Sequence, residues 1–266
     1  MRNIGIMTMS TLREAMSKKV FIFFIGISLI ILVIQVIIFS LFKTNTWASG
    51  MSASEGISRL ELMIISPLSG LCLLLSIFSC SSFIPSMLEK GNIDLLLSKP
   101  VSRTELLLGK YIGGLLVVFI NILILILGVW FIIGVKFGYW NFAFLYSSLL
   151  ITFTFAVLYS IIVLLGVITQ GSMSGMMAAY FIYIILSPLL YMAKFKGMNF
   201  IENETLKTGI NWFYYIIPKT QELMGDTLND LTTKNGIQNY QPVATSFAFL
   251  IVMLLLSIFL FRKKDF

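Results

Sequence analysis

The chain has 266 residues, of which 58% are hydrophobic and only 12% are charged. Ordinary soluble domains carry about 45–50% apolar and about 25% charged residues, so this composition excludes a water-soluble globule. The 23 Phe and 10 Tyr residues also exclude intrinsic disorder, because disordered segments are poor in aromatic residues. The net charge of +7 comes from Lys and Arg residues beside apolar runs. That placement is typical of membrane topology signals and not of a nucleic-acid-binding surface.

Six apolar runs are long enough to cross a bilayer, which requires about 20 mostly apolar residues. They cover residues 20–42, 62–84, 111–135, 142–168, 173–192 and 243–261. The sequence therefore predicts an all-α, polytopic membrane protein with six transmembrane helices, in which residues 1–266 form a single domain. The first run is longer than the apolar core of a secretion signal, roughly 7–15 residues, so we expect it to remain as a span. Residues 1–19 are predicted to be an amphipathic lead-in.

Charged and aromatic residues beside the spans predict that both termini lie in the cytoplasm. Lys and Arg are enriched in short cytoplasmic segments, and here they cluster before the first span, between the second and third spans, and after the last. Trp and Tyr favour the membrane interfaces, and Trp47, Tyr139, Trp140 and Trp212 all fall in segments that this topology places outside. Residues 193–242 then form a long extracytoplasmic loop. We expect a multi-pass protein of the inner (cytoplasmic) cell membrane.

The cytoplasmic segment between the second and third spans, residues 89–105, contains signals for a short separate helix. Gly91 is suited to the left-handed conformation that ends a helix, and Asn92 is suited to capping the next one. Pro100 ends this short helix, since proline disfavours helical geometry in the residue before it. Ser102 and Glu105 then have the spacing of a capping box, which begins the helix of the third span.

The short helix carries Ile93, Leu96 and Leu97 on one side and needs an apolar surface against which to bury them. One interpretation is an interfacial helix that lies on the lipid headgroups. The other is a helix that docks onto a soluble partner protein. Local physical chemistry leaves both interpretations open.

Three stretches of the chain resemble a known family. Residues 96–110, Leu-Leu-Ser-Lys-Pro-Val-Ser-Arg-Thr-Glu-Leu-Leu-Leu-Gly-Lys, are similar to the segment after the second span in permease subunits of ATP-binding cassette (ABC) transporters of the type-2 exporter class. Residues 12–20 resemble the amphipathic lead-in of those permeases. Residues 216–220, Ile-Ile-Pro-Lys-Thr, resemble the subgroup associated with copper-enzyme maturation and gliding. With the six-span layout, the resemblance covers nearly the whole chain.

The resemblance implies a half-transporter that pairs with a second permease, identical or different, and with two nucleotide-binding ATPase subunits. Those partners would bind ATP and Mg, and this chain would bind no cofactor. In the family, the helix after the second span is a coupling helix that sits in a cleft of the ATPase, which favours the docking interpretation. The implied coupling residues are Glu89, Lys90, Asn92, Ile93, Asp94, Leu96, Leu97, Lys99, Pro100 and Arg103.

Missing motifs narrow the function further. The chain has no G-x-x-x-x-G-K-[ST] string, which cradles phosphates in ATPases, so the motor must lie on another polypeptide. It has no His, and the predicted spans carry no charged residue in their interiors. Both features disfavour ion-coupled transport, a metal site and an intramembrane enzyme. The expected function is the transmembrane subunit of an ATP-driven exporter. The alternative is a membrane-anchoring or force-transmitting subunit that transports nothing, although the modest loops favour transport.

Small and polar residues inside the spans are candidates for a substrate path. A weakly polar stripe on the second span consists of Ser69, Cys72, Ser76 and Ser79. Small residues also let helices pack closely in lipid, so this stripe has two interpretations. Gln35 in the first span and Asn121 in the third are costly to place in lipid. They either contact a substrate or bridge helices through hydrogen bonds.

Two features of the fifth span and the loop after it point to contacts. Gly171, Gly175 and Ala178 give the start of the fifth span a small-residue spacing that favours helix contact, within the subunit or between subunits. The aromatic run 212–217, ended by Pro218, is too short to span and suits a helix at the outer interface, where the related permeases have an external gate. Residues 219–241 are polar and are a candidate contact for an extracytoplasmic partner.

Overall fold

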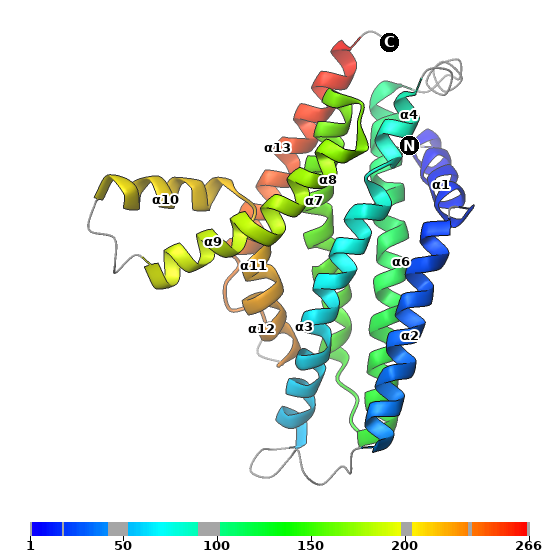
Figure 1. Ribbon diagram of the computed structural model, residues 1–266, viewed down its shortest axis with the longest axis vertical. Coiled ribbons are helices and arrows are strands. Elements are labelled where there is room, and N and C mark those ends of the chain that lie inside the picture. Colours follow the sequence, from blue (N-terminus) through cyan, green and yellow to red (C-terminus); the bar gives the residue numbers. More distant parts are fainter. Residues whose placement is uncertain are drawn as a thin grey trace.

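The computed structural model describes residues 2–17, 19–41, 53–89, 102–197, 204–233 and 236–264. Of these residues 91% are helical and none is in a strand, which confirms the predicted all-α class. Figure 1 shows long helices running along the long axis of the molecule, with both termini at one end. Two helices, α9 and α10, project sideways from this bundle (Figure 1).

The helices follow one another in a simple order. The first are α1 (Arg2–Ser17), α2 (Lys19–Leu41), α3 (Ala53–Cys80), α4 (Phe83–Leu88) and α6 (Arg103–Phe137). The 3-10 helix η2 (Phe142–Tyr146) leads into α7 (Ser147–Thr169). Next come α8 (Ser172–Tyr180), the π-helix η3 (Phe181–Leu186), α9 (Ser187–Met192) and the π-helix η4 (Ala193–Gly197). The last are α10 (Glu204–Ile216), α11 (Thr220–Glu222), the π-helix η5 (Leu223–Thr227), α12 (Leu228–Thr232) and α13 (Gln241–Lys263).

Five continuous helical stretches are long and apolar enough to cross a membrane. They are Glu55–Leu88, Arg103–Phe137, Phe142–Thr169, Ser172–Phe195 and Gln241–Lys263, and they overlap the last five predicted spans. The first predicted span, residues 20–42, falls on α2, whose described apolar part is the shorter stretch Phe24–Ile38. The membrane-spanning class is therefore confirmed with five candidate spans, and the count of six stays a prediction.

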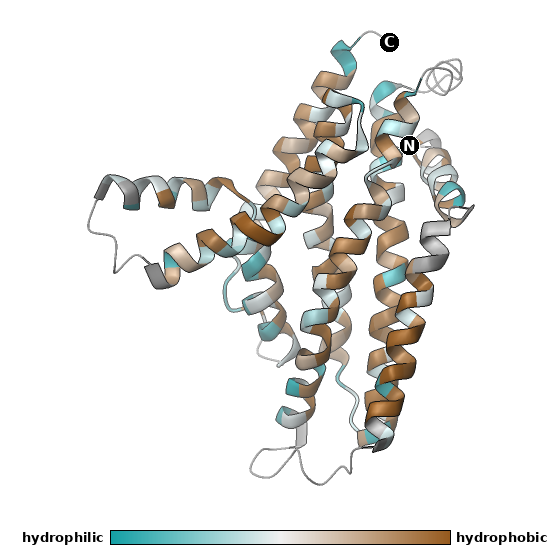
Figure 2. Ribbon diagram, in the orientation of Figure 1, coloured by the Kyte–Doolittle hydropathy of each residue, from teal (hydrophilic) through white to brown (hydrophobic). Residues whose placement is uncertain are grey.

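The helix α7 forms the centre of the bundle. In its most apolar stretch 72% of the residues are buried, against 11% in α13. It packs against α6, α8 and α13, and α6 packs in turn against α1, α2 and α3. Figure 2 shows hydrophobic residues along most of the bundle and hydrophilic residues gathered mainly toward its ends and in α11–α12. The bundle thus has an apolar middle, as a lipid environment requires, between more polar ends.

Local signals mark the ends of α6 and α7. The predicted capping box is present: Ser102 Oγ accepts from the Glu105 N–H, and the Glu105 carboxylate accepts from the Ser102 N–H. At the other end of α6, Gly138 takes the left-handed conformation (φ 68°) and its N–H donates to the Gly134 carbonyl. Gln170 ends α7 in the same conformation (φ 55°), which is uncommon for a residue other than glycine.

The amphipathic helix α1 packs against the first turns of α6. Gly109 and Gly113 lie about one turn apart on α6, and α1 approaches so closely that a Cβ atom on either glycine would lie 2.5 Å from a side-chain carbon of α1. The buried ammonium of Lys110 donates to the carboxylate of Glu14 on α1. A groove of glycines and one ion pair therefore hold α1 on the bundle.

We expect Gly113→Ala to loosen α1. The added Cβ would meet Thr11 of α1, and such overpacking costs about 1–3 kcal/mol. Alanine also favours a helix interior over glycine by about 1 kcal/mol, so only the clash makes the change unfavourable. Hydrogen exchange of residues 2–17 should speed up and the melting temperature in detergent should fall. Gly26→Ala is the matched control, because nothing lies within 4 Å of its Cβ position. Equal behaviour of the two variants would contradict the docked α1.

Candidate functional site

Most of the predicted coupling residues lie outside the described part of the chain: Lys90, Asn92, Ile93, Asp94, Leu96, Leu97, Lys99 and Pro100. The two that are described flank this segment. Glu89 follows α4, where its backbone is extended and the residue is exposed. Arg103 is the first residue of α6. Both α4 and α6 pack against α7, so the segment between them is anchored at both ends in the bundle.

Arg103 joins the start of α6 to the end of α13. Its Nη1 donates to the carbonyl of Lys264 at 2.5 Å and to those of Phe261 and Arg262 at 3.4 Å. Lys264 extends this contact, since its Nζ donates to the carbonyls of Val167 at 2.9 Å and Ile168 at 3.1 Å in α7. Three helix ends therefore meet at one end of the bundle. The sequence predicted Arg103 as a coupling residue but held no signal for partners about 160 residues away.

The predicted stripe on the second span lies inside the packed bundle. Ser69, Cys72 and Ser76 are buried and Ser79 is half-buried. The hydroxyl of Ser69 donates to the Ser66 carbonyl and that of Ser76 to the Cys72 carbonyl, so both bond within their own helix. These contacts support the helix-packing interpretation, and a substrate path along this stripe stays a prediction.

Among the described residues, neither Gln35 nor Asn121 forms a hydrogen bond to another helix, and a bridge to the rest of an assembly stays a prediction. The Asn121 side-chain amide donates to the Val117 carbonyl of its own helix at 2.9 Å. The Asn121 Oδ1 and both polar side-chain atoms of Gln35 are buried and have no hydrogen-bond partner among the described residues. Both side chains therefore keep unused hydrogen-bonding capacity within the spans, and a contact of either with substrate stays a prediction.

The small residues at the start of the fifth span differ in how closely they pack. A Cβ on Gly175 would lie 3.0 Å from the backbone of Ile162 in α7, so Gly175 allows α8 to pack closely within the chain. Ala179, one turn further on, is fully buried, whereas Ala178 is half-buried. Gly171 meets only neighbouring atoms of Thr169 at 3.8 Å. Of the predicted residues, Gly175 therefore allows close packing within the chain, and a contact between subunits through this face stays a prediction.

A buried polar cluster ties the N-terminal part of α3 to the residue before η2. Glu61 and Asn141 are both completely buried. The side-chain amide of Asn141 donates to the Glu61 carboxylate at 2.7 Å and to the Thr232 carbonyl at 3.0 Å. The predicted second span begins at residue 62, directly after Glu61. The structure extends α3 back to Ala53, because the polar residues there continue the helix beyond the apolar run.

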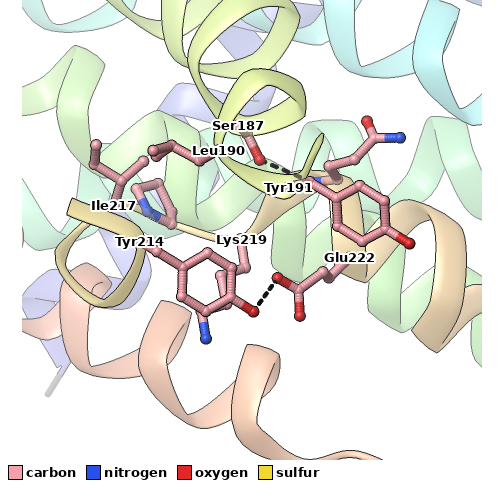
Figure 3. Close-up of a pocket in the computed structure, with 9 residues that line it drawn as sticks. Ser187, Leu190, Tyr191, Tyr214, Ile217, Lys219 and Glu222 are labelled. Atoms are coloured by element: carbon pink, nitrogen blue, oxygen red, sulfur yellow. Dashed lines mark hydrogen bonds between the residues drawn. The ribbon is translucent and has the colours of Figure 1, made fainter. Parts of the chain in front are cut away.

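A small pocket lies where α9, α10 and α11 meet (Figure 3). Its lining includes Ser187 and Tyr191 of α9, Tyr214 of α10, and Gln221 and Glu222 of α11. The Tyr214 hydroxyl donates to Glu222 at 2.6 Å, and the Gln221 N–H donates to Ser187 Oγ at 3.0 Å, as Figure 3 shows. These bonds tie α11 to both neighbouring helices.

Two lysines contact the aromatic side of this pocket. The Lys194 and Lys219 ammonium nitrogens lie 3.8 and 4.0 Å from the ring centroid of Tyr214, and both also lie over Tyr215. Such cation–π contacts stabilise a cation where water is scarce. The backbone N–H of Lys219 donates to Ser246 Oγ, within the apolar helix α13. Lys219 is therefore held at the level of the last span.

Burial shifts the proton equilibria of this cluster. Loss of water around the Lys219 ammonium lowers its pKa to about 8, an effect that Glu222 opposes and Lys194 increases. Burial likewise raises the pKa of Glu222, against the hydrogen bond from Tyr214 and the charge of Lys219. Sequence analysis considered Tyr214 and Lys219 only within the aromatic run and the resemblance. The sequence signal for this cluster is the short spacing of Tyr214, Tyr215, Lys219 and Glu222 on the two sides of Pro218, and that signal was missed.

The predicted outer helix is longer than the aromatic run. It is α10, which begins at Glu204 and ends at Ile216, just before Pro218. Trp212, Phe213 and Ile216 are exposed on it, and Figure 1 shows α10 running across the bundle axis. An amphipathic helix with exposed aromatic residues suits a membrane interface. Among the described residues, no group of three or more Cys, Asp and Glu side chains is placed to hold a metal ion.

These features define a multi-pass α-helical membrane protein with polar contacts at both ends of its bundle. A family model described as ABC-2 family transporter protein matches residues 84–266, which is more than half of the chain. The chain therefore belongs to the ABC-2 transporter family and is the membrane component of an ABC transporter. A search of curated proteins found no match.

Replacing Lys219 by Met should change how stability depends on pH. The Lys219 pKa is near 8 in the folded protein and about 10.4 in an unfolded chain, so between these values only the unfolded state holds this proton. The charge is therefore unfavourable to folding below pH 8, and that cost is relieved as pH rises toward 10. We expect Lys219→Met to melt at a higher temperature than the parent at pH 7, with a smaller difference at pH 10.

The control for this measurement is Lys136→Met, which removes an exposed lysine at the end of α6. A difference between Lys219→Met and the parent that is the same at both pH values would contradict the assignment of a buried charge to Lys219.

Proposed function

We propose that this chain is the transmembrane subunit of an ATP-driven exporter and works with a separate nucleotide-binding subunit. The family match over residues 84–266 is the observation that carries this proposal. The absence of a phosphate-binding loop from the sequence supports it, because the energy must then come from a partner. ATP and Mg belong to that partner, and this chain has no catalytic role. The resemblance of residues 216–220 favours the copper-enzyme-maturation and gliding subgroup.

The proposed coupling element is residues 89–105. The segment joins α4 to α6, and both helices pack against the central helix α7. A push on the segment would therefore act directly on the core of the bundle. Its predicted apolar side, Ile93, Leu96 and Leu97, is the surface that would sit in the ATPase cleft.

We further propose six spans, with both termini in the cytoplasm of a cell whose inner membrane holds the protein. The common position of the two termini at one end of the bundle agrees with an even number of spans (Figure 1). Residues 193–242 would then face outward, with the pocket of α9, α10 and α11 among them and room for an extracytoplasmic partner. The largely exposed apolar faces of α2 and α13 are available to lipid or to a second permease, identical or different.

The proposal predicts that an ATPase chain with a phosphate-binding loop co-purifies with the tagged protein from its native membranes. Leu96→Asp together with Leu97→Asp should abolish that recovery, because two carboxylates cannot be buried in an apolar cleft without a large desolvation cost. Membrane insertion should be unchanged, since both positions lie outside the spans. Mass spectrometry of the purified complex gives the measurement.

Leu95→Asp is the matched control. Leu95 lies on the opposite side of the predicted short helix, so its substitution should leave the ATPase bound. If the double variant retained the ATPase as well as the control does, residues 89–105 would not be the docking element. The interfacial-helix interpretation would then be favoured.

A further inference from the structure

The last turns of α7 and α13 end close together and have unusual partners. The final carbonyl groups of any α-helix lack partners inside the helix. In α13 these groups accept from the guanidinium of Arg103, and in α7 they accept from the ammonium of Lys264. Cations are favourable at this position, because the C-terminal end of a helix carries partial negative charge.

Arg103 occupies a position that its own helix disfavours. It is the first residue of α6, where the helix dipole presents partial positive charge and acidic residues are preferred. Glu105 in the same turn follows that preference through the capping box. Contacts with α13 offset the local disadvantage of Arg103. The Arg103 side chain therefore stabilises the contact with α13 and not the first turn of its own helix.

The helix α13 packs against α7 and, less extensively, against α6, and much of its surface is exposed. Only 11% of its most apolar stretch is buried, whereas α7 is 72% buried. The apolar side chain of Phe261 is fully buried there, and its carbonyl is one of the Arg103 acceptors. Arg103 therefore adds a polar link between α6 and α13 beside the packing of both helices on α7.

We infer that Arg103 and Lys264 form a clamp that passes movement of residues 90–101 from α6 to α13 and onward to α7. Arg103 stands two residues after that segment, so any displacement of the segment reaches it first. The Lys264 carbonyl accepts from Arg103 while the Lys264 ammonium donates to α7, so one residue links both steps. Both are positioning residues. The inference rests on the proposed coupling role of residues 89–105.

The clamp is tested on the complex with its co-purified ATPase, by measuring distances between pairs of spin labels with pulsed electron paramagnetic resonance. Each labelled protein carries two spin labels at exposed positions. One is at Met63 on α3 as the reference, and the other is at Leu116 on α6, Phe259 on α13 or Ile168 on α7. The background carries Cys72→Ala and Cys80→Ala, because both native thiols are free. Distances are compared without nucleotide and with ATP plus vanadate.

In the parent, ATP plus vanadate should shift all three distances. In Arg103→Gln the α6 shift should remain, and the shifts of α13 and α7 should be smaller than in the parent, since both helices still pack within the bundle. In Lys264→Gln, which removes only the contact with α7 and is used if Arg103→Gln does not fold, the α13 shift should remain and the α7 shift should be smaller. Arg262→Gln removes a neighbouring exposed charge and should behave as the parent.

Parent-like shifts of α13 and α7 in Arg103→Gln, or of α7 in Lys264→Gln, would overturn the clamp while leaving the proposed function intact. A purified protein that carries no ATPase, or whose α6 distance ignores nucleotide, would overturn the proposed function itself and the clamp with it. Retention of the α13 shift in Arg103→Lys would support the cation as the element that matters.

Discussion

The hydrocarbon core of a bilayer offers no water to polar groups, and this constraint determines where the chain places its polar contacts. Backbone groups in the spans are bonded within helices. Ser and Thr hydroxyl groups inside the spans follow the same rule, as Ser76 does by donating to the Cys72 carbonyl. The hydroxyls of Tyr111 and Tyr180 instead donate to carbonyls of α7 and α3. Contacts between helices in the apolar middle are therefore mostly matters of shape, with Gly175 against Ile162 as the clearest case.

Several polar contacts between distant parts of the chain lie at the two ends of the bundle. At one end, Arg103 and Lys264 join α6, α13 and α7, and Lys110 pairs with Glu14 of α1. Toward the other, Asn141 links Glu61 to Thr232. An apolar bundle tied at both ends can tilt as a unit without exposing unpaired polar groups to lipid. That property is what a permease driven from outside the membrane requires.

Sequence reasoning recovered the features that depend on nearby residues. The Ser102 and Glu105 capping box needs only three residues, and the apolar runs of the last five spans need only composition. Contacts between segments that lie far apart in the sequence could not be predicted from local patterns. Gly109 and Gly113 have the same spacing as Gly171 and Gly175, yet only a three-dimensional structure shows that the first pair seats α1 and that Gly171 meets only atoms of the nearby Thr169. The partners of Arg103 and the cluster around Lys219 likewise lie on other helices.

The central claim is that the two polar ends face opposite sides of the membrane, with Arg103 and Lys264 on the ATPase side. Cysteine accessibility in spheroplasts tests it most directly, using single cysteines at the exposed positions Asn239 and Lys263 in a chain without Cys72 and Cys80. An impermeant maleimide should label position 239 in intact spheroplasts and position 263 only after permeabilisation. Labelling of position 263 in intact spheroplasts would contradict the account.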